Sequence, residues 1–149
     1  MPSPFPHHYE VELLAGGHAT GMITASGRPF ILGAAPPEFD GPPGHWGPEH
    51  LLLSSVALCL MTTYQALAGR ARLPMVRYAS RAEGILDKTA AGLAFTSIVV
   101  QVDLGVEADQ IERAERLMES AQRHCIVSNA LRVPVIVQAR VHARDSVAV

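Results

Sequence analysis

The 149-residue sequence is poor in cysteine, in lysine and in net charge of either sign. Its 12 basic and 14 acidic residues leave a net charge of −2, so it lacks the basic excess that indicates a nucleic-acid or anionic-membrane partner. Residues 1–8 hold three prolines, and no cationic start followed by an apolar run, so they are not a secretory signal. We therefore expect a cytoplasmic protein that binds neither nucleic acid nor membranes.

The sequence contains two cysteines, Cys59 and Cys125. In a reducing compartment such thiols are more often catalytic, redox-sensing, metal-binding or simply buried than joined in a permanent disulfide. Free cysteine also packs like a small hydrophobic residue, which leaves a purely structural explanation open. The function therefore depends on whether these two thiols react.

A long helix from Pro48 to Ala68 is expected at the centre of one domain that spans residues 1–149, a typical single-domain length. Pro48 and Glu49 suit a helix start, and Gly69 suits its C-terminal cap. Residues 51–67 are apolar or small on every side, which predicts a buried helix. The stretch is too short and too rich in hydroxyl groups for a membrane span.

Strands are expected on both sides of this helix, because several stretches alternate between apolar and polar residues. A proline- and glycine-rich loop, residues 36–47, leads into the helix. A second, amphipathic helix is expected at residues 108–124, with Cys125 at the end of its apolar face, followed by a short helical turn. The expected strands are residues 8–13, 20–24 and 30–32 before the central helix, and 75–86, 93–104 and 133–143 after it. This order, β-β-β-α-β-β-α-β, predicts an α+β fold in which helices cover an antiparallel sheet of about six strands.

Two separated motifs surround the cysteines. The first is PEHLL at residues 48–52 followed by ALC at residues 57–59, and the second is HCIVSNAL at residues 124–131. Together with the strand order and the loop before Glu49, they resemble the OsmC/Ohr family of osmotically inducible and organic hydroperoxide resistance proteins. The resemblance implies an OsmC-like fold and an intertwined homodimer. It also implies a thiol peroxidase for organic hydroperoxides that is re-reduced by a small or protein dithiol and needs no cofactor.

Carried over to this sequence, the resemblance makes Cys59 the peroxidatic thiol, Cys125 the resolving thiol and Glu49 the acid of the site. Along one continuous helix, Glu49 and Cys59 lie about 15 Å apart, at 1.5 Å per residue, so they do not touch within one chain. We expect Glu49 to reach Cys59 of a second copy, with the two helices antiparallel about a two-fold axis near Ser54 and Ser55.

The sequence departs from the family pattern in two places. Peroxidase members carry an arginine in the first hairpin, which lowers the pKa of the reactive thiol, whereas residues 16–21 read GGHATG. His18 or Arg28 could take the place of this arginine beside the reactive thiol. Ile126 also stands where a proline is expected. These departures favour one alternative, a protein of the same fold that binds an apolar small molecule and keeps its thiols reduced.

Histidines suggest a further alternative. His45, His50 and His124 stand near the cysteines in sequence or in expected space, and imidazole with thiolate suits zinc. However, no C-x2-C or H-x3-H spacing is present. We therefore expect no metal site.

Overall fold

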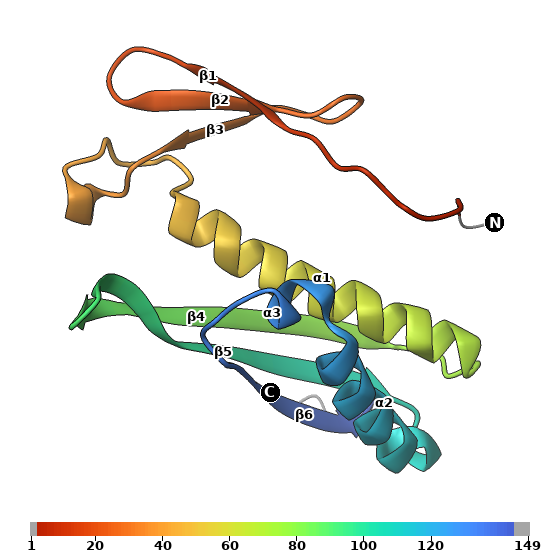
Figure 1. Cartoon of the computed structure of the whole chain (residues 1–149). Coiled ribbons are helices and arrows are strands. Elements are labelled where there is room, and N and C mark those ends of the chain that lie inside the picture. The colour runs from red at the N-terminus through yellow and green to blue at the C-terminus, as the bar shows by residue number, and fades with distance from the viewer. Residues whose placement is uncertain (1–2, 145–149) are drawn as a thin grey trace. The chain divides into compact units, whose positions relative to one another are not determined.

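The structure is a computed structural model that describes residues 3–144, and it divides the chain into two compact units, Met1–Leu51 and Leu52–Val149. Figure 1 shows the elements in chain order. The α+β class and the predicted strand and helix order are confirmed. The expectation of a single domain over residues 1–149 stays a prediction.

The first unit contains a three-stranded antiparallel sheet in the order β1-β2-β3. At the turn between β1 and β2, His18 and Ala19 both adopt the left-handed conformation, with φ of 57°. Of residues 3–51, only Gly33, Ala34 and Gly47 are buried. The unit therefore has almost no core of its own. Its elements are β1 (Glu12–Ala15), β2 (Thr20–Thr24), β3 (Ile31–Ala34) and a 3-10 turn (Pro37–Phe39).

Helix α1 (Pro48–Arg70) begins in the first unit and continues into the second. Its start is closed by a local hydrogen bond, because the Gly47 N–H donates to His50 Nδ1 at 3.1 Å. This bond satisfies one of the N–H groups that a helix start leaves without a partner. The expected cap at Gly69 is wrong, since the helix continues through Arg70 and the left-handed residue that follows it is Arg72, with φ of 52°.

Helix α1 is not buried on every side. Only one stripe of four residues, spaced four apart, is buried: Val56, Leu60, Tyr64 and Ala68. The prediction of an all-round buried helix is wrong for the chain by itself, because the second sheet covers one face only. By length and composition alone α1 could also cross a membrane, but the core helices of soluble proteins meet the same criterion.

The second unit is built on the three strands β4 (Arg77–Thr89), β5 (Gly92–Val106) and β6 (Val135–Ala143). Strands β4 and β5 form the expected antiparallel hairpin, whereas β6 pairs parallel to β5. The prediction of one antiparallel sheet is therefore corrected to two sheets of three strands with one parallel pair. The reason is the crossover between β5 and β6, which contains two helices and allows β6 to run in the same direction as β5.

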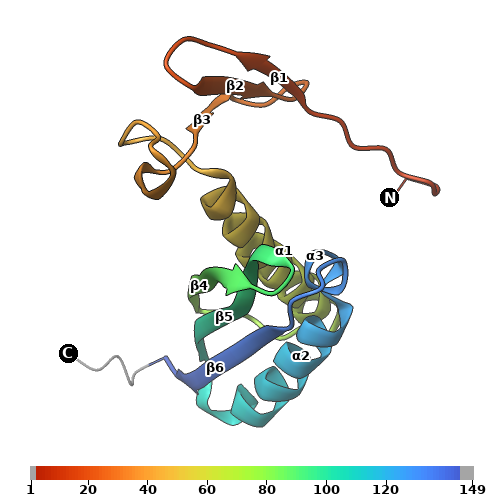
Figure 2. The ribbon, with the colours of Figure 1, turned by 60° about the vertical axis from the view of Figure 1, so that its left-hand side comes forward.

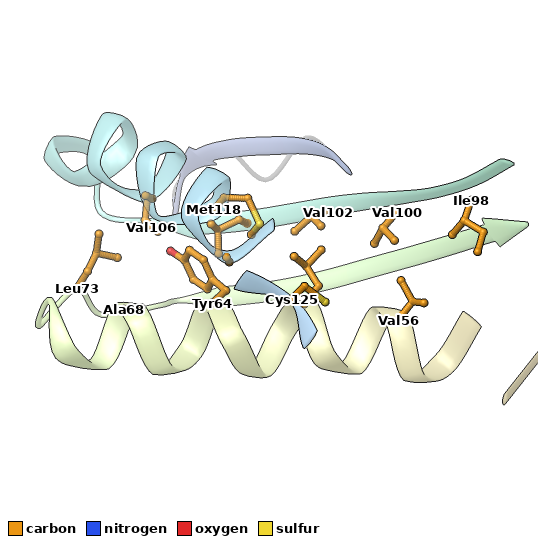
Figure 3. Close-up of a cluster of buried hydrophobic side chains, with 14 residues drawn as sticks. Val56, Tyr64, Ala68, Leu73, Ile98, Val100, Val102, Val106, Met118 and Cys125 are labelled. Atoms are coloured by element: carbon orange, nitrogen blue, oxygen red, sulfur yellow. The ribbon is translucent and has the colours of Figure 1, made fainter. Parts of the chain in front are cut away.

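Helices α2 (Ile111–His124) and α3 (Ile126–Asn129) form that crossover. Helix α2 lies next to β6 (Figure 2) and buries Ala114, Met118 and Ala121, as its pattern predicted. The core of the unit lies between α1, α2 and the inward face of β5 (Figure 3). The buried side chains of β5 are Ile98, Val100, Val102, Leu104 and Val106.

Candidate functional site

The fold brings the two cysteines together in the second unit. Cys59 lies in the middle of α1, and Cys125 is the residue that joins α2 to α3. Both thiols are free, and they are close enough for the Cys125 thiol to lower the pKa of Cys59 by hydrogen bonding. The Cys59 side chain is partly exposed, whereas Cys125 is 1% exposed and belongs to the core.

The pKa of Cys59 is lower than that of an ordinary thiol. Burial raises it, but neutral hydrogen-bond donors outweigh the burial: the Val127 N–H, the Cys125 thiol, the Thr63 hydroxyl and the Ile126 N–H. The Thr63 hydroxyl has one proton and already donates it to the Cys59 carbonyl oxygen at 2.7 Å. The two peptide N–H groups lie in the first turn of α3, where they have no partner within the helix. These two N–H groups can therefore donate to the Cys59 sulfur without giving up another hydrogen bond.

Cys125 has the opposite character. Burial raises its pKa most, and the neighbouring Cys59 raises it further. The Ser128 hydroxyl donates to Cys125 Sγ at 3.2 Å and acts in the other direction. The site thus pairs a partly exposed thiol whose pKa is lowered with a buried thiol whose pKa is raised. This difference in pKa is expected between a nucleophilic thiol and the second thiol that later forms a disulfide with it.

Glu49 lies in the first turn of α1, ten residues before Cys59 on one unbroken helix. The rise of 1.5 Å per residue separates the two by about 15 Å, so the sequence argument against a contact within one chain holds. The Glu49 Oε2 atom is buried, and among residues 3–144 it has no hydrogen-bond partner. A buried carboxylate oxygen without a hydrogen bond costs free energy. We therefore expect a group outside the described contacts to donate a hydrogen bond to Glu49 Oε2.

The family pattern places an arginine beside the reactive thiol. Within residues 3–144, no arginine forms a hydrogen bond or ion pair with either sulfur. Arg28 donates to the Ser26 carbonyl oxygen at 2.5 Å, and His18 lies in the β1–β2 turn. Both belong to the first unit, so their part in the site stays a prediction.

The three histidines of the metal-site alternative make local hydrogen bonds. His45 Nδ1 lies 3.1 Å from the Pro43 carbonyl oxygen, and His124 Nδ1 lies 2.7 Å from the Ser120 carbonyl oxygen. His50 accepts the Gly47 N–H at the start of α1. Within residues 3–144, no three His, Cys, Asp or Glu side chains form a group that could hold a metal ion.

Sequence reasoning missed the groups that set the chemistry of the two sulfurs. Ser128 stands three residues after Cys125, which is the spacing of neighbours on one helix face. That spacing could have indicated Ser128. The N–H groups of Ile126 and Val127 carry no sequence signal, because every residue except proline has one.

Comparisons with known proteins identify the family and the fold of the chain. A family model described as OsmC-like protein matches residues 41–140. The uncharacterized protein YmaD of Bacillus subtilis (strain 168) is 26% identical over 137 residues, which cover 89% of this chain and 91% of YmaD.

Solved structures share the fold. An OsmC-like protein of unknown function from Vibrio cholerae has a TM-score of 0.81 at 17% identity, and the match covers 91% of this chain and 100% of that one. The organic hydroperoxide resistance protein OhrB of Bacillus subtilis has a TM-score of 0.66 at 22% identity, and the match covers 91% of this chain and 98% of that one.

Proposed function

The chain belongs to the family of OsmC-like proteins, and from that premise we propose that it is a thiol-dependent peroxidase that reduces organic hydroperoxides with Cys59 and Cys125 as its redox pair. Proteins that share its fold include organic hydroperoxide resistance proteins. The observation that carries the proposal is that the fold places the partly exposed Cys59 thiol, of lowered pKa, beside the buried Cys125 thiol, of raised pKa.

The reaction begins with the Cys59 thiolate, which attacks the distal oxygen of the hydroperoxide. The O–O bond breaks, the alkoxide takes a proton from water and leaves as the alcohol, and Cys59 becomes a sulfenic acid. The Cys125 sulfur then displaces the hydroxyl group from Cys59, so a disulfide forms and the hydroxyl group leaves with the Cys125 proton as a water molecule. A dithiol reductant in the cytoplasm reduces this disulfide and is itself oxidised to a disulfide.

The proposal includes a homodimer. One stripe of α1 remains exposed on the chain, and its members are small or apolar residues four apart: Ser54, Leu58, Thr62 and Ala66. Leu58 is 58% exposed. Small side chains at this spacing let two helices approach closely. Two α1 helices packed antiparallel about a two-fold axis near Ser54 and Ser55 would bring Glu49 of one copy toward Cys59 of the other. The second copy would then be the source of a hydrogen-bond partner for Glu49 Oε2.

The experiment is a count of free thiols after one equivalent of tert-butyl hydroperoxide is added to the reduced protein. A peroxidase loses both thiols and releases tert-butanol, because one Cys59–Cys125 disulfide forms in each chain. Cys59→Ser should leave Cys125 unreacted. Cys125→Ser should leave a sulfenic acid on Cys59 that a dimedone probe captures. Two unreacted thiols in the unsubstituted protein would contradict the proposal.

The second candidate is a protein of this fold that binds an apolar small molecule with idle thiols. The observation that favours it is the lack of an arginine contact to either sulfur among residues 3–144. The same thiol count separates the two functions, since the binding protein keeps both thiols in the presence of hydroperoxide.

A further inference from the structure

Two tyrosines of the second unit lie in or against the core cluster that contains Cys125, and within residues 3–144 neither hydroxyl has a hydrogen-bond partner. Tyr64 of α1 is 0% exposed, and its ring lies 6.1 Å from that of Tyr78 of β4. Each hydroxyl oxygen is buried. Figure 3 shows Tyr64 in the same core as Cys125. A buried hydroxyl without a partner costs free energy, so two of them in this core require an explanation.

Charge on Cys125 affects the pKa of only one of these two tyrosines. Tyr78 packs against the core cluster that contains Cys125. Burial is the main cause that raises the pKa of Tyr78 to about 12, and charge on Cys125 and on Tyr64 contributes to the same shift. For Tyr64, burial alone raises the pKa. Tyr78 is therefore a phenol that keeps its proton at the pH values at which thiols react, and of the two tyrosines it is the one on which a charge at Cys125 acts.

Cys125 carries a charge when the disulfide is reduced, and the donors to its sulfur then matter. When the Cys59–Cys125 disulfide is reduced, an external thiolate attacks the more exposed sulfur, that of Cys59, and forms a new S–S bond with it. The old S–S bond breaks, and its electron pair goes to the buried Cys125 sulfur as a thiolate. The Ser128 hydroxyl donates to this sulfur at 3.2 Å, and the Ser128 N–H also acts on it. A buried anion needs further hydrogen bonds to offset the loss of water.

We propose that the buried hydroxyl of Tyr78 donates a hydrogen bond to Cys125 when this sulfur leaves as a thiolate, and thereby accelerates reduction of the disulfide. The inference rests on the proposed function, since it concerns the reductive half of the same cycle. It explains why a tyrosine and not a phenylalanine stands at a position where the hydroxyl has no partner in the reduced protein. After the dithiol's second sulfur has released Cys59, the Cys125 thiolate takes a proton from solvent and Tyr78 keeps its own.

The first test measures the Cys125 pKa without any peroxide chemistry. In a Cys59→Ser background, the ultraviolet absorbance of the Cys125 thiolate is followed against pH, with and without Tyr78→Phe. Loss of the donor should raise the Cys125 pKa. Tyr64→Phe is the matched control, because it removes an equally buried and unpartnered hydroxyl from the neighbouring ring and should leave the Cys125 pKa unchanged. Both variants keep the aromatic ring, and removal of an unpartnered hydroxyl favours folding.

The second test measures the rate at which dithiothreitol reduces the Cys59–Cys125 disulfide, formed beforehand with diamide. Tyr78→Phe should slow reduction roughly threefold to tenfold, because a more basic thiolate leaves more slowly, whereas Tyr64→Phe should match the unsubstituted protein. An unchanged Cys125 pKa in Tyr78→Phe, or equal effects of the two substitutions, would overturn the inference. If no disulfide forms, the proposed function fails, while the Cys125 pKa still decides the role of Tyr78.

Discussion

The Ser128 hydroxyl of α3 donates a hydrogen bond of 3.2 Å to the Sγ atom of Cys125, the residue that joins α2 to α3. The neighbouring N–H groups of Ile126 and Val127 act on Cys59 instead. One short helix therefore supplies donors to both sulfurs: the hydroxyl and N–H of Ser128 act on the buried thiol, and the N–H groups of Ile126 and Val127 act on the reactive one. A substitution at Ser128 can therefore remove a donor to Cys125 and leave the N–H donors to Cys59 in place.

Ser128→Ala should raise the pKa of Cys125, because it removes a donor that stabilises the thiolate. Reduction of the Cys59–Cys125 disulfide by dithiothreitol should then slow by roughly threefold or more. The oxidation of Cys59 by hydroperoxide should change little, since the N–H donors to that sulfur remain. Stopped-flow measurement of the two half-reactions checks this difference. Equal slowing of both would show that the turn, and not the hydroxyl, had been disturbed.

A hydrogen-bonded pair on the other face of the second sheet should make stability depend on pH. His142 Nε2 lies 2.7 Å from Asp103 Oδ1. The Asp103 carboxylate, with the Ala143 carbonyl oxygen, raises the pKa of His142 above its ordinary 6.5. The hydrogen bond from His142, aided by Arg77 and Arg140, lowers the pKa of Asp103 below its ordinary 3.8.

The signs of these two shifts define a pH window. The His142 contribution is complete below pH 6.5 and is lost as the pH rises through the raised value. The Asp103 contribution is complete above pH 3.8 and is lost as the pH falls through the lowered value. Asp103→Asn should therefore reduce stability most between these limits and return the His142 pKa toward 6.5, as measured by urea unfolding and by NMR titration.

The matched control for this substitution is Asp87→Asn on β4. Asp87 accepts the Lys88 N–H at 2.7 Å at an exposed position, so its substitution makes the same charge change without touching the His142 pair. Urea unfolding curves of Asp87→Asn should keep the pH dependence of the unsubstituted protein. A similar loss of pH dependence in both variants would contradict the role given to the pair.

Two glycines should respond to alanine in opposite directions. A Cβ at Gly84 of β4 would lie 2.7 Å from Phe95 Cε1 and 3.0 Å from Leu53 Cδ2, so Gly84→Ala should destabilise the protein by about 1–3 kcal/mol through overpacking. A Cβ at Gly69 of α1 would meet nothing within 4 Å. Gly69→Ala should stabilise the protein by up to about 1 kcal/mol, because alanine favours a helix interior. Urea unfolding measures both.

The proposed dimer can be tested on the exposed stripe of α1. Leu58→Glu places a charge on a side chain that is 58% exposed on the chain, so the fold of the second unit should remain. If the stripe is the dimer interface, the substitution buries an unpaired carboxylate there and should shift the protein to monomer in sedimentation velocity. Glu115→Arg, on the exposed face of α2, is the control and should leave self-association unchanged. An unsubstituted protein that sediments as a monomer would contradict the proposal directly.

The sequence by itself determined the order of the elements. The alternation of residues 93–104 and the apolar face of residues 108–124 predicted β5 and α2 because they reflect local periods, two for a strand and about 3.6 for a helix. The two cysteine motifs identified the family and proposed Cys59, Cys125 and Glu49 as site residues. These conclusions need only neighbours in the chain, so the sequence was sufficient for them.

Only the tertiary structure decided which side of α1 is buried, how β6 pairs, and which sulfur ionises more readily. Helix α1 is apolar all round, so its sequence could not show that the sheet covers one stripe from Val56 to Ala68. The pKa difference between the two cysteines comes from burial and from backbone N–H groups. Every residue except proline has such a group, and its effect depends on where the fold places it, so the sequence carries no signal for it.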